Sequence, residues 1–371
     1  MSLIDRRLLT HLNWGLLASL IVLYAVGLIN LYSACGTRLE DGLVLSPYYR
    51  RQIIWGCGGF VVMIGAMSFD YRRLTNISHF LYGAAVLSLL MVPLVGKLAL
   101  GARRWLDFGL FQFQPSEIAK VAVLILGAQL LAKDSLPLGW GPLCQIFAVA
   151  AVPAGLIILQ PDLGTALTIL FILGGMIAFH GVTKNVIKGS LVIGPLLLPL
   201  CWMFMLHDYQ KQRIMTFLDP GSDPLGAGYH IAQAKIAIGS GQMFGKGWLQ
   251  GTQSLLRFLP EKHTDFAIAV FGEEWGFVGC ILLMILFCTF LLGIFNTVRD
   301  AKDRFGSTLA AGVFIYFFWQ ILINTGMVLG LLPVVGIPLP FLSYGGSATL
   351  LNFALVGLVL NISMRRFMFK G

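Results

Sequence analysis

Charged side chains are scarce in this sequence. Asp, Glu, Lys and Arg make up 12% of its 371 residues, whereas 57% are hydrophobic, so there is too little polar surface to cover a soluble globule. The 26 Lys and Arg exceed the 17 Asp and Glu, but these cations are scattered through short segments rather than massed together, which argues against a nucleic-acid partner. The composition predicts a membrane protein.

Signature motifs of common enzyme classes are also missing. The sequence has no Walker loop, no dinucleotide-binding fingerprint, no Gly-x-Ser-x-Gly and no His-Glu-x-x-His. Its six cysteines lie in or beside apolar runs without paired spacing, so neither a disulfide framework nor a zinc site is indicated. Any chemistry must therefore depend on acids, bases and cationic side chains.

What the sequence does have is a series of apolar runs long enough to cross a bilayer as helices. We predict an all-α, polytopic membrane protein of about ten transmembrane helices, forming a single domain over residues 1–371. Residues 207–265 form a large polar loop between the seventh and eighth spans. The expected spans are residues 14–34, 53–69, 77–95, 118–132, 143–159, 166–179, 191–206, 266–294, 309–332 and 349–362.

The loop charges predict how the bundle is oriented. With the N-terminus inside, the short inside segments hold more Lys and Arg than the short outside loops, as the positive-inside rule requires. Both termini are then cytoplasmic, and the 207–265 loop and most acidic residues lie outside. We therefore expect the working face of the protein to look outward.

Asp265 is the strongest candidate for catalysis. It closes the long loop in the run Pro260-Glu261-Lys262-His263-Thr264-Asp265-Phe266, directly before an apolar span. Partial removal of water there would raise its pKa and suit it to accept a proton. The alternative is that Asp265 only caps the following helix, although a cap does not explain the ionisable residues gathered beside it.

Glu117 and Lys120 lie three residues apart at the start of the fourth span. At this spacing both charges fall on one helix face and can pair. Because ionisable groups at membrane depth are costly, they usually face a bundle interior or a wet cavity. We predict that this pair lines a substrate cavity; a purely structural ion pair is the alternative.

The loop before that span contains Arg103, Arg104 and Trp105. The two guanidinium groups could clamp a pyrophosphate while the indole lies at headgroup level, although interfacial anchoring explains them nearly as well. Asp162, in the tight turn Gln160-Pro161-Asp162-Leu163-Gly164, is explained by turn formation; a weaker alternative is that it helps to bind a divalent cation, Mg²⁺ or Mn²⁺.

Further candidates lie in the 207–265 loop and in the last outer loop. A polar helix is expected from His207, and an amphipathic helix over residues 227–239. We expect Arg213, Lys246 and His263 to contact substrate. The glycine-rich run at 239–247 is either a flexible connection or a phosphate cradle. The proline- and glycine-rich residues 330–347 predict non-helical chain at membrane depth that lines a cavity.

Several of these motifs resemble those of the SEDS family of bacterial shape, elongation, division and sporulation proteins. The resemblance covers essentially the whole chain, and within the family it favours the rod-shape branch over the division branch. The matching stretches are Arg104-Trp105 through Gln114-Pro115-Ser116-Glu117, the turn 160–165, the run 260–266, and Asn324 through Ser343-Tyr344-Gly345-Gly346-Ser347-Ala348.

This resemblance implies a peptidoglycan glycosyltransferase that polymerises lipid II on the outer face of the membrane during cell elongation. The implied partners are a class B penicillin-binding protein and other elongation-complex membrane proteins. The family's essential aspartate falls on Asp265, and its conserved glutamate and lysine fall on Glu117 and Lys120.

Two other functions fit a multi-span bundle with interior charges. One is a flippase that moves lipid II across the membrane, although the sequence has no clear internal repeat. The other is a non-catalytic scaffold for the penicillin-binding protein. Polymerisation of lipid II in detergent, where no membrane sidedness exists, distinguishes an enzyme from both.

Overall fold

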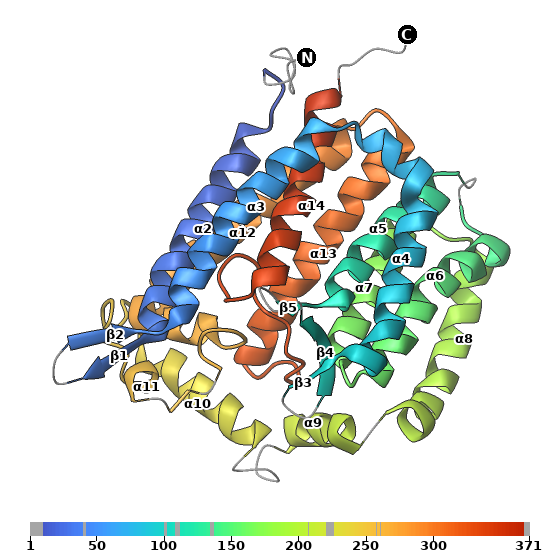
Figure 1. Cartoon of the computed structure of the whole chain (residues 1–371). Coiled ribbons are helices and arrows are strands. Elements are labelled where there is room, and N and C mark those ends of the chain that lie inside the picture. The colour runs from blue at the N-terminus through green and yellow to red at the C-terminus, as the bar shows by residue number, and fades with distance from the viewer. Residues whose placement is uncertain are drawn as a thin grey trace.

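The computed structural model describes residues 10–39, 42–99, 102–107, 112–133, 137–206, 208–219, 226–256, 258–259 and 261–366. Long helices running side by side form a bundle (Figure 1). They are α2 (Trp14–Cys35), α3 (Pro47–Ser68), α4 (Leu74–Val95), α5 (Pro115–Lys133), α6 (Trp140–Leu159), α7 (Leu163–His180), α8 (Lys184–Leu200), α12 (Ala267–Asp300), α13 (Arg304–Val328) and α14 (Gly346–Arg365).

Within these described ranges, nine helices are long and apolar enough to span a membrane, α3 being the long helix left out. Helix α3 has 22 residues, as α2 has, but its first turns carry Arg50, Arg51 and Gln52. It runs beside α2 and α14 in the same bundle (Figure 1). The predicted all-α polytopic membrane protein is therefore confirmed.

The helix limits differ from the apolar runs in a consistent way. Helix α3 begins at Pro47 rather than at residue 53, and α6 begins at Trp140 rather than at residue 143. These first turns hold polar residues, glycine or proline, which hydropathy excludes although the helical backbone tolerates them at its N-terminus. The expected seventh span becomes α8 followed by a π-helical turn, η2 (Cys201–Met205).

Short elements gather at one end of the bundle, at the bottom of Figure 1. Strands β1 (Gly36–Leu39) and β2 (Gly42–Leu45) form an antiparallel hairpin; β3 (Lys97–Ala99), β4 (Ala102–Asp107) and β5 (Gln112–Phe113) form a second small sheet. Helices α9 (Asp208–Leu218), α10 (Ala227–Ser240) and α11 (Thr252–Leu255) come from the long polar loop. Sequence analysis predicted the first two of these helices but none of the strands.

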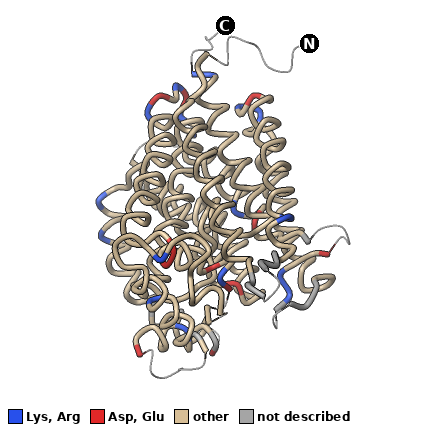
Figure 2. The backbone as a smooth tube through the Cα atoms, turned by 90° about the vertical axis from the view of Figure 1, so that its left-hand side faces the viewer, with Lys and Arg blue, Asp and Glu red and all other residues tan. Residues whose placement is uncertain are grey.

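The opposite end holds the start of α2 and the end of α14 (Figure 1), where Ser363 Oγ donates to the His11 carbonyl at 3.4 Å. A short 3₁₀ turn, η1 (Tyr71–Arg73), also lies there, joining α3 to α4. Charged residues gather at this end and toward the opposite end, and a few lie at intermediate height (Figure 2). Most of the length of the bundle between its ends is uncharged, as the cost of placing charges at membrane depth requires.

The glycine-rich run at 239–247 packs against α12 where that helix is interrupted. Gly276, with φ of 64°, interrupts that helix. The amides of Lys246 and Gly247 donate to the carbonyls of residues 273 and 274, each at 3.0 Å, and those of residues 277 and 278 donate back to residues 242 and 243. The amides of Lys246 and Gly247 therefore already donate hydrogen bonds within the protein. This part of the run is a packed contact with α12 rather than a phosphate cradle or a flexible connection.

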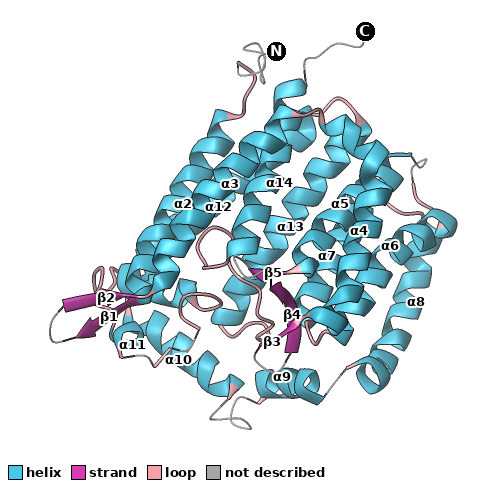
Figure 3. Ribbon diagram, in the orientation of Figure 1, coloured by secondary structure: helices cyan, strands magenta, loops and turns pink. Residues whose placement is uncertain are grey.

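A non-helical segment between α13 and α14 threads through the centre of the bundle (Figure 3). Phe341 inserts between Phe290, Phe317 and Phe353, with ring centroids 5.5–5.7 Å away. The backbone of this segment passes so close to α2 that a Cβ on Gly27 would lie 2.0 Å from the Phe341 carbonyl oxygen. Non-helical chain was predicted here, and it is buried at its centre, as such backbone must be among membrane helices.

Candidate functional site

Asp265 lies in a turn just before α12, and its backbone is held from two directions. Asn324 of α13 donates from Nδ2 to the Asp265 carbonyl at 3.0 Å and to the Ile337 carbonyl at 2.8 Å. Ser343 Oγ donates to the Thr264 carbonyl at 2.6 Å. The segment between α13 and α14 therefore fixes the position of Asp265, although it follows that residue in the chain by some seventy positions.

The surroundings of Asp265 raise its affinity for a proton. Removal of water by burial, helped by the negative charges of Glu261 and Asp162, raises its pKa to about 6, against the opposing effect of Arg213. Gly336, with φ of 74°, faces this carboxylate: a Cβ there would lie 3.5 Å from Oδ2. The group is thus a carboxylate at neutral pH with a pKa suited to general-base chemistry.

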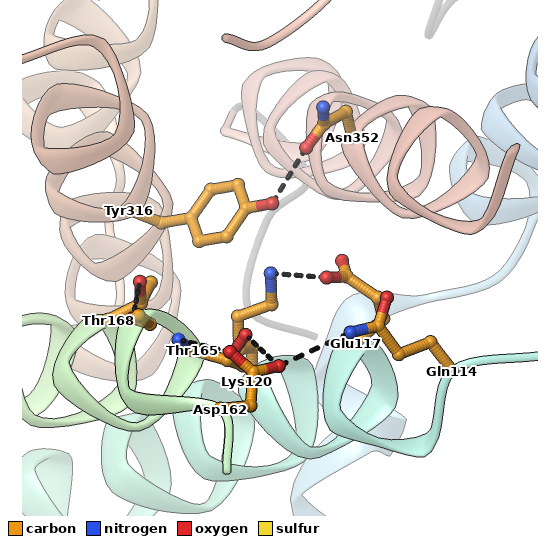
Figure 4. Close-up of polar contacts among 9 residues, drawn as sticks. Gln114, Glu117, Lys120, Asp162, Thr165, Thr168, Tyr316 and Asn352 are labelled. Carbon is orange, nitrogen blue, oxygen red and sulfur yellow. Dashed lines mark hydrogen bonds and ion pairs between the residues drawn. The ribbon is translucent and has the colours of Figure 1, made fainter. Parts of the chain in front are cut away.

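Arg213 and Asp162 both act on Asp265 electrostatically. Arg213, in α9, donates from Nη1 to the Val334 carbonyl at 3.1 Å, which places α9 against the segment before α14. Asp162 caps α7: its carboxylate accepts from the Thr165 amide at 3.3 Å and the Thr165 hydroxyl at 2.9 Å (Figure 4). Residues far apart in sequence therefore converge on one carboxylate.

Glu117 and Lys120 form the ion pair that their spacing predicts, with Nζ 2.7 Å from Oε1. Both are buried inside the bundle, and Lys120 Nζ lies 5.5 Å from the centre of the Tyr316 ring. The Tyr316 hydroxyl donates to Asn352 Oδ1 at 2.8 Å, so α5, α13 and α14 all contribute to this polar cluster (Figure 4). Among the contacts described, Glu117 Oε2 accepts no hydrogen bond.

Sequence analysis missed the α13 contribution to these sites. Tyr316, Gln320 and Asn324 are spaced four residues apart, which places them along one face of that helix. All three are buried. Three polar residues at helical spacing within an apolar run are the signal that could have identified them.

Arg103 and Arg104 donate to different parts of the chain. They are neighbours in strand β4, at an irregularity in its pairing with β3, where Arg103 pairs with Leu98 and Trp105 pairs with Lys97. Arg103 Nη1 donates to the Pro93 carbonyl at 2.9 Å, whereas Arg104 donates to the carbonyls of residues 160 and 161 in the α6–α7 turn. The two guanidinium groups thus have different partners within the protein, and a pyrophosphate clamp by the two arginines, or a substrate contact by Trp105 beside them, remains a prediction.

Lys246 and His263 both have partners within the protein. Lys246 Nζ lies 2.7 Å from Glu273 Oε1, and this fully buried carboxylate also accepts from the Gln253 amide at 3.0 Å. His263 stacks on Tyr48, with ring centroids 4.6 Å apart, and burial lowers its pKa, which favours the neutral imidazole. Substrate contact by either side chain remains a prediction.

A divalent cation has no complete protein site in the described ranges. No group of three or more His, Cys, Asp or Glu side chains there is placed to hold a metal ion. Asp162 and Asp265 share one electrostatic environment, but the nearby Arg213 would repel a cation. The metal at Asp162 therefore stays a prediction, and we derive no chemical step through it.

The fold and the site define a polytopic helical membrane protein with a carboxylate at the end of its largest polar loop. The family model for the cell cycle proteins FtsW, RodA and SpoVE matches residues 13–367. The chain belongs to this family, which confirms the resemblance found in its motifs.

Proteins similar to this chain are named peptidoglycan glycosyltransferases or probable peptidoglycan glycosyltransferases. The peptidoglycan glycosyltransferase MrdB of Escherichia coli K12 is 40% identical over 359 residues, covering 96% of this chain and 94% of the relative. The peptidoglycan glycosyltransferase RodA of Treponema pallidum is 32% identical, covering 95% and 98%. A probable peptidoglycan glycosyltransferase FtsW of a Geobacter species is 36% identical, covering 93% and 95%.

Solved structures agree with this fold. A chain of a peptidoglycan synthase complex, studied for its polymerization and crosslinking, superposes with a TM-score of 0.82 at 30% identity, covering 96% of this chain and 99% of its own length. The rod shape determining protein RodA of Thermus thermophilus superposes with a TM-score of 0.70 at 27% identity, covering 96% and 98%.

Proposed function

We propose that this peptidoglycan glycosyltransferase polymerises lipid II into β-1,4-linked glycan strands during cell elongation and releases undecaprenyl pyrophosphate. The observation that carries the proposal is Asp265: a carboxylate of raised pKa, with its backbone fixed by α13 and by the segment before α14. Relatives at up to 40% identity across nearly the whole chain are named peptidoglycan glycosyltransferases.

The chemistry requires one base. Asp265 accepts the proton of the GlcNAc 4-hydroxyl as that oxygen attacks the anomeric carbon of MurNAc on a second glycan-lipid. The new C–O bond forms while the bond from the anomeric carbon to the pyrophosphate breaks, and the pyrophosphate leaves with the electron pair. Inversion gives the β-1,4 link without a covalent intermediate, so a second carboxylate acting as nucleophile is not needed.

The departing pyrophosphate needs positive charge nearby. Arg213 is the candidate best supported by position, because it acts electrostatically on Asp265 from α9. Lys120 contributes a second cation from within the bundle, and Arg103 and Arg104 lie on the short sheet at the same end. A bound divalent cation remains a further proposal, in which substrate oxygens would supply ligands in addition to those that the described part of the chain offers.

The topology supports a site on the outer face of the cytoplasmic membrane. The start of α2 and the end of α14 lie at one end of the bundle, and helices α9 to α11 lie at the other (Figure 1). With both termini cytoplasmic, Asp265 is extracytoplasmic. A chain of a peptidoglycan synthase complex has the same fold, which supports a class B penicillin-binding protein as partner, together with other membrane proteins of the elongation complex.

Polymerisation of purified lipid II in detergent tests the proposal. We expect the protein, in complex with its penicillin-binding partner and with the transpeptidase inhibited, to convert lipid II into glycan strands resolved by gel electrophoresis. Detergent has no membrane sidedness, so a flippase produces no strands, and neither does a non-catalytic scaffold. Failure of the intact complex to polymerise lipid II would contradict the enzymatic function.

The pH dependence of polymerisation should reflect the pKa of Asp265, which burial raises to about 6. The base is active when deprotonated, so the rate is full above this pKa and falls as pH drops through about 6. Glu261→Gln removes a negative charge that raises this pKa, and should move the acid limb to lower pH. Arg213→Gln removes the opposing positive charge and should move it to higher pH. Equal acid limbs in all three proteins would exclude Asp265 as the titrating base.

A further inference from the structure

Six aromatic and imidazole rings lie in two contacting groups at the extracytoplasmic end, linked through the adjacent residues Tyr48 and Tyr49, and together we call them the aromatic band. Tyr48 stacks on His263 at 4.6 Å and lies 4.9 Å from Tyr344. Tyr49, its neighbour in the first turn of α3, lies 5.2 Å from Tyr32, whose ring is 5.8 Å from that of Trp248. The band comprises Tyr32, Tyr48, Tyr49, Trp248, His263 and Tyr344.

The aromatic band is joined to the proposed catalytic residue through the backbone. His263 precedes Asp265 by two residues, and the Tyr344 amide donates to the His263 carbonyl at 2.8 Å. Adjacent residues on a helix project about 100° apart. Tyr48 therefore contacts His263, near Asp265, while Tyr49 contacts Tyr32 of α2. A molecule lying along these rings would have one end beside the proposed base.

Part of this surface is open to a ligand. Tyr48 is 38% exposed and Trp248 is 49% exposed, although both rings also contact other aromatic residues. Arg50 and Arg51, both exposed, come next in α3, and the positive charge of Arg51 acts on the Tyr344 hydroxyl. Flat rings flanked by hydroxyls and guanidinium groups suit a sugar, whose ring C–H faces stack on aromatic rings while its hydroxyl, acetamido and carboxylate groups take hydrogen bonds.

We propose that the aromatic band is a binding site for the growing glycan strand, holding the sugars next to the one that reacts at Asp265. This inference rests on the proposed function, because that reaction supplies the strand. The acidic stem peptides of such a strand match the positive charge of Arg50 and Arg51. Ordinary membrane-interface anchoring predicts separate rings facing lipid, whereas these rings pack on one another beside the site.

The test is binding of a synthetic GlcNAc–MurNAc tetrasaccharide to the purified full-length protein. We expect saturable calorimetric binding and a change in tryptophan emission that Trp248→Phe abolishes. Tyr48→Ala should weaken binding roughly three- to tenfold, as loss of one stacking contact does. Tyr48→Phe keeps the ring and should stay within about twofold of the wild type. Phe80→Ala removes a ring that is 76% exposed on α4, away from the band, and should bind as the wild type does.

The strand product gives a second measurement. Tyr48→Ala and Trp248→Ala should each shorten the strands made from lipid II, because a strand held less tightly is released earlier. Unchanged tetrasaccharide affinity in Tyr48→Ala, with the wild type still polymerising, would overturn the glycan site and leave interfacial anchoring. Loss of the penicillin-binding partner in these variants, with unchanged tetrasaccharide affinity, would overturn it in favour of a protein interface. A wild type that binds the sugar but does not polymerise would instead contradict the proposed function.

Discussion

Asp265→Asn should lower the rate of lipid II polymerisation by about 10²- to 10⁴-fold, the range that general-base catalysis typically contributes. The amide has nearly the shape of the carboxylate but cannot take the proton of the sugar hydroxyl. The measurement is the initial rate of strand formation in detergent at neutral pH, with the penicillin-binding partner present and its transpeptidase inhibited.

The control for folding follows from the sign of the pKa shift. A carboxyl whose pKa is raised in the folded state costs stability where it is ionised, so Asp265→Asn should melt at the same temperature as the wild type or higher at neutral pH. Glu261→Gln, which neutralises an exposed acid in the same turn, should retain polymerisation at neutral pH. A fully active Asp265→Asn protein would remove this residue from the mechanism.

Lys120→Met should lower the free energy of unfolding by about 3–5 kcal/mol, the usual cost of removing one partner of a buried ion pair. The substitution leaves Glu117 without its cation inside the bundle, where Oε2 of that carboxylate already accepts no hydrogen bond in the described contacts. Thermal unfolding in detergent, monitored by size-exclusion chromatography, measures this loss of stability.

A double variant separates the charge from the packing. Glu117→Gln combined with Lys120→Met removes both charges and should recover most of the lost stability, since no uncompensated ion remains. If the double variant recovers stability but not polymerisation, the pair acts on the substrate in addition to holding α5 against α13. A Lys120→Met protein as stable as the wild type would contradict the assignment of a buried, mutually dependent pair.

Local sequence determined the helices and one of the polar pairs. The apolar runs identified the long helices because a helix that crosses the hydrocarbon core of the bilayer must be apolar over a fixed length. The spacing of Glu117 and Lys120 predicted their ion pair because residues three apart share a helix face. Both inferences use contacts made within one element.

The same reasoning was wrong where partners come from elsewhere in the chain. The glycine-rich run suggested a phosphate cradle or a flexible connection, but its glycines allow close approach to the α12 backbone at Gly276. For Arg103 and Arg104, the joint clamp remains a prediction, but sequence analysis did not predict the strand that holds them or the separate backbone carbonyls to which they donate.

The sequence by itself determined that this is a helical membrane protein, and its motifs pointed to Asp265 as the acid with a catalytic role. Only the tertiary structure decided what surrounds that acid: Asn324 and Ser343 fix its turn, and Arg213 and Asp162 shift its pKa in opposite directions. The physical reason is that transfer from water to a bilayer depends on the composition of each segment. The pKa of a carboxyl, in contrast, depends on charges and burial brought together from distant segments.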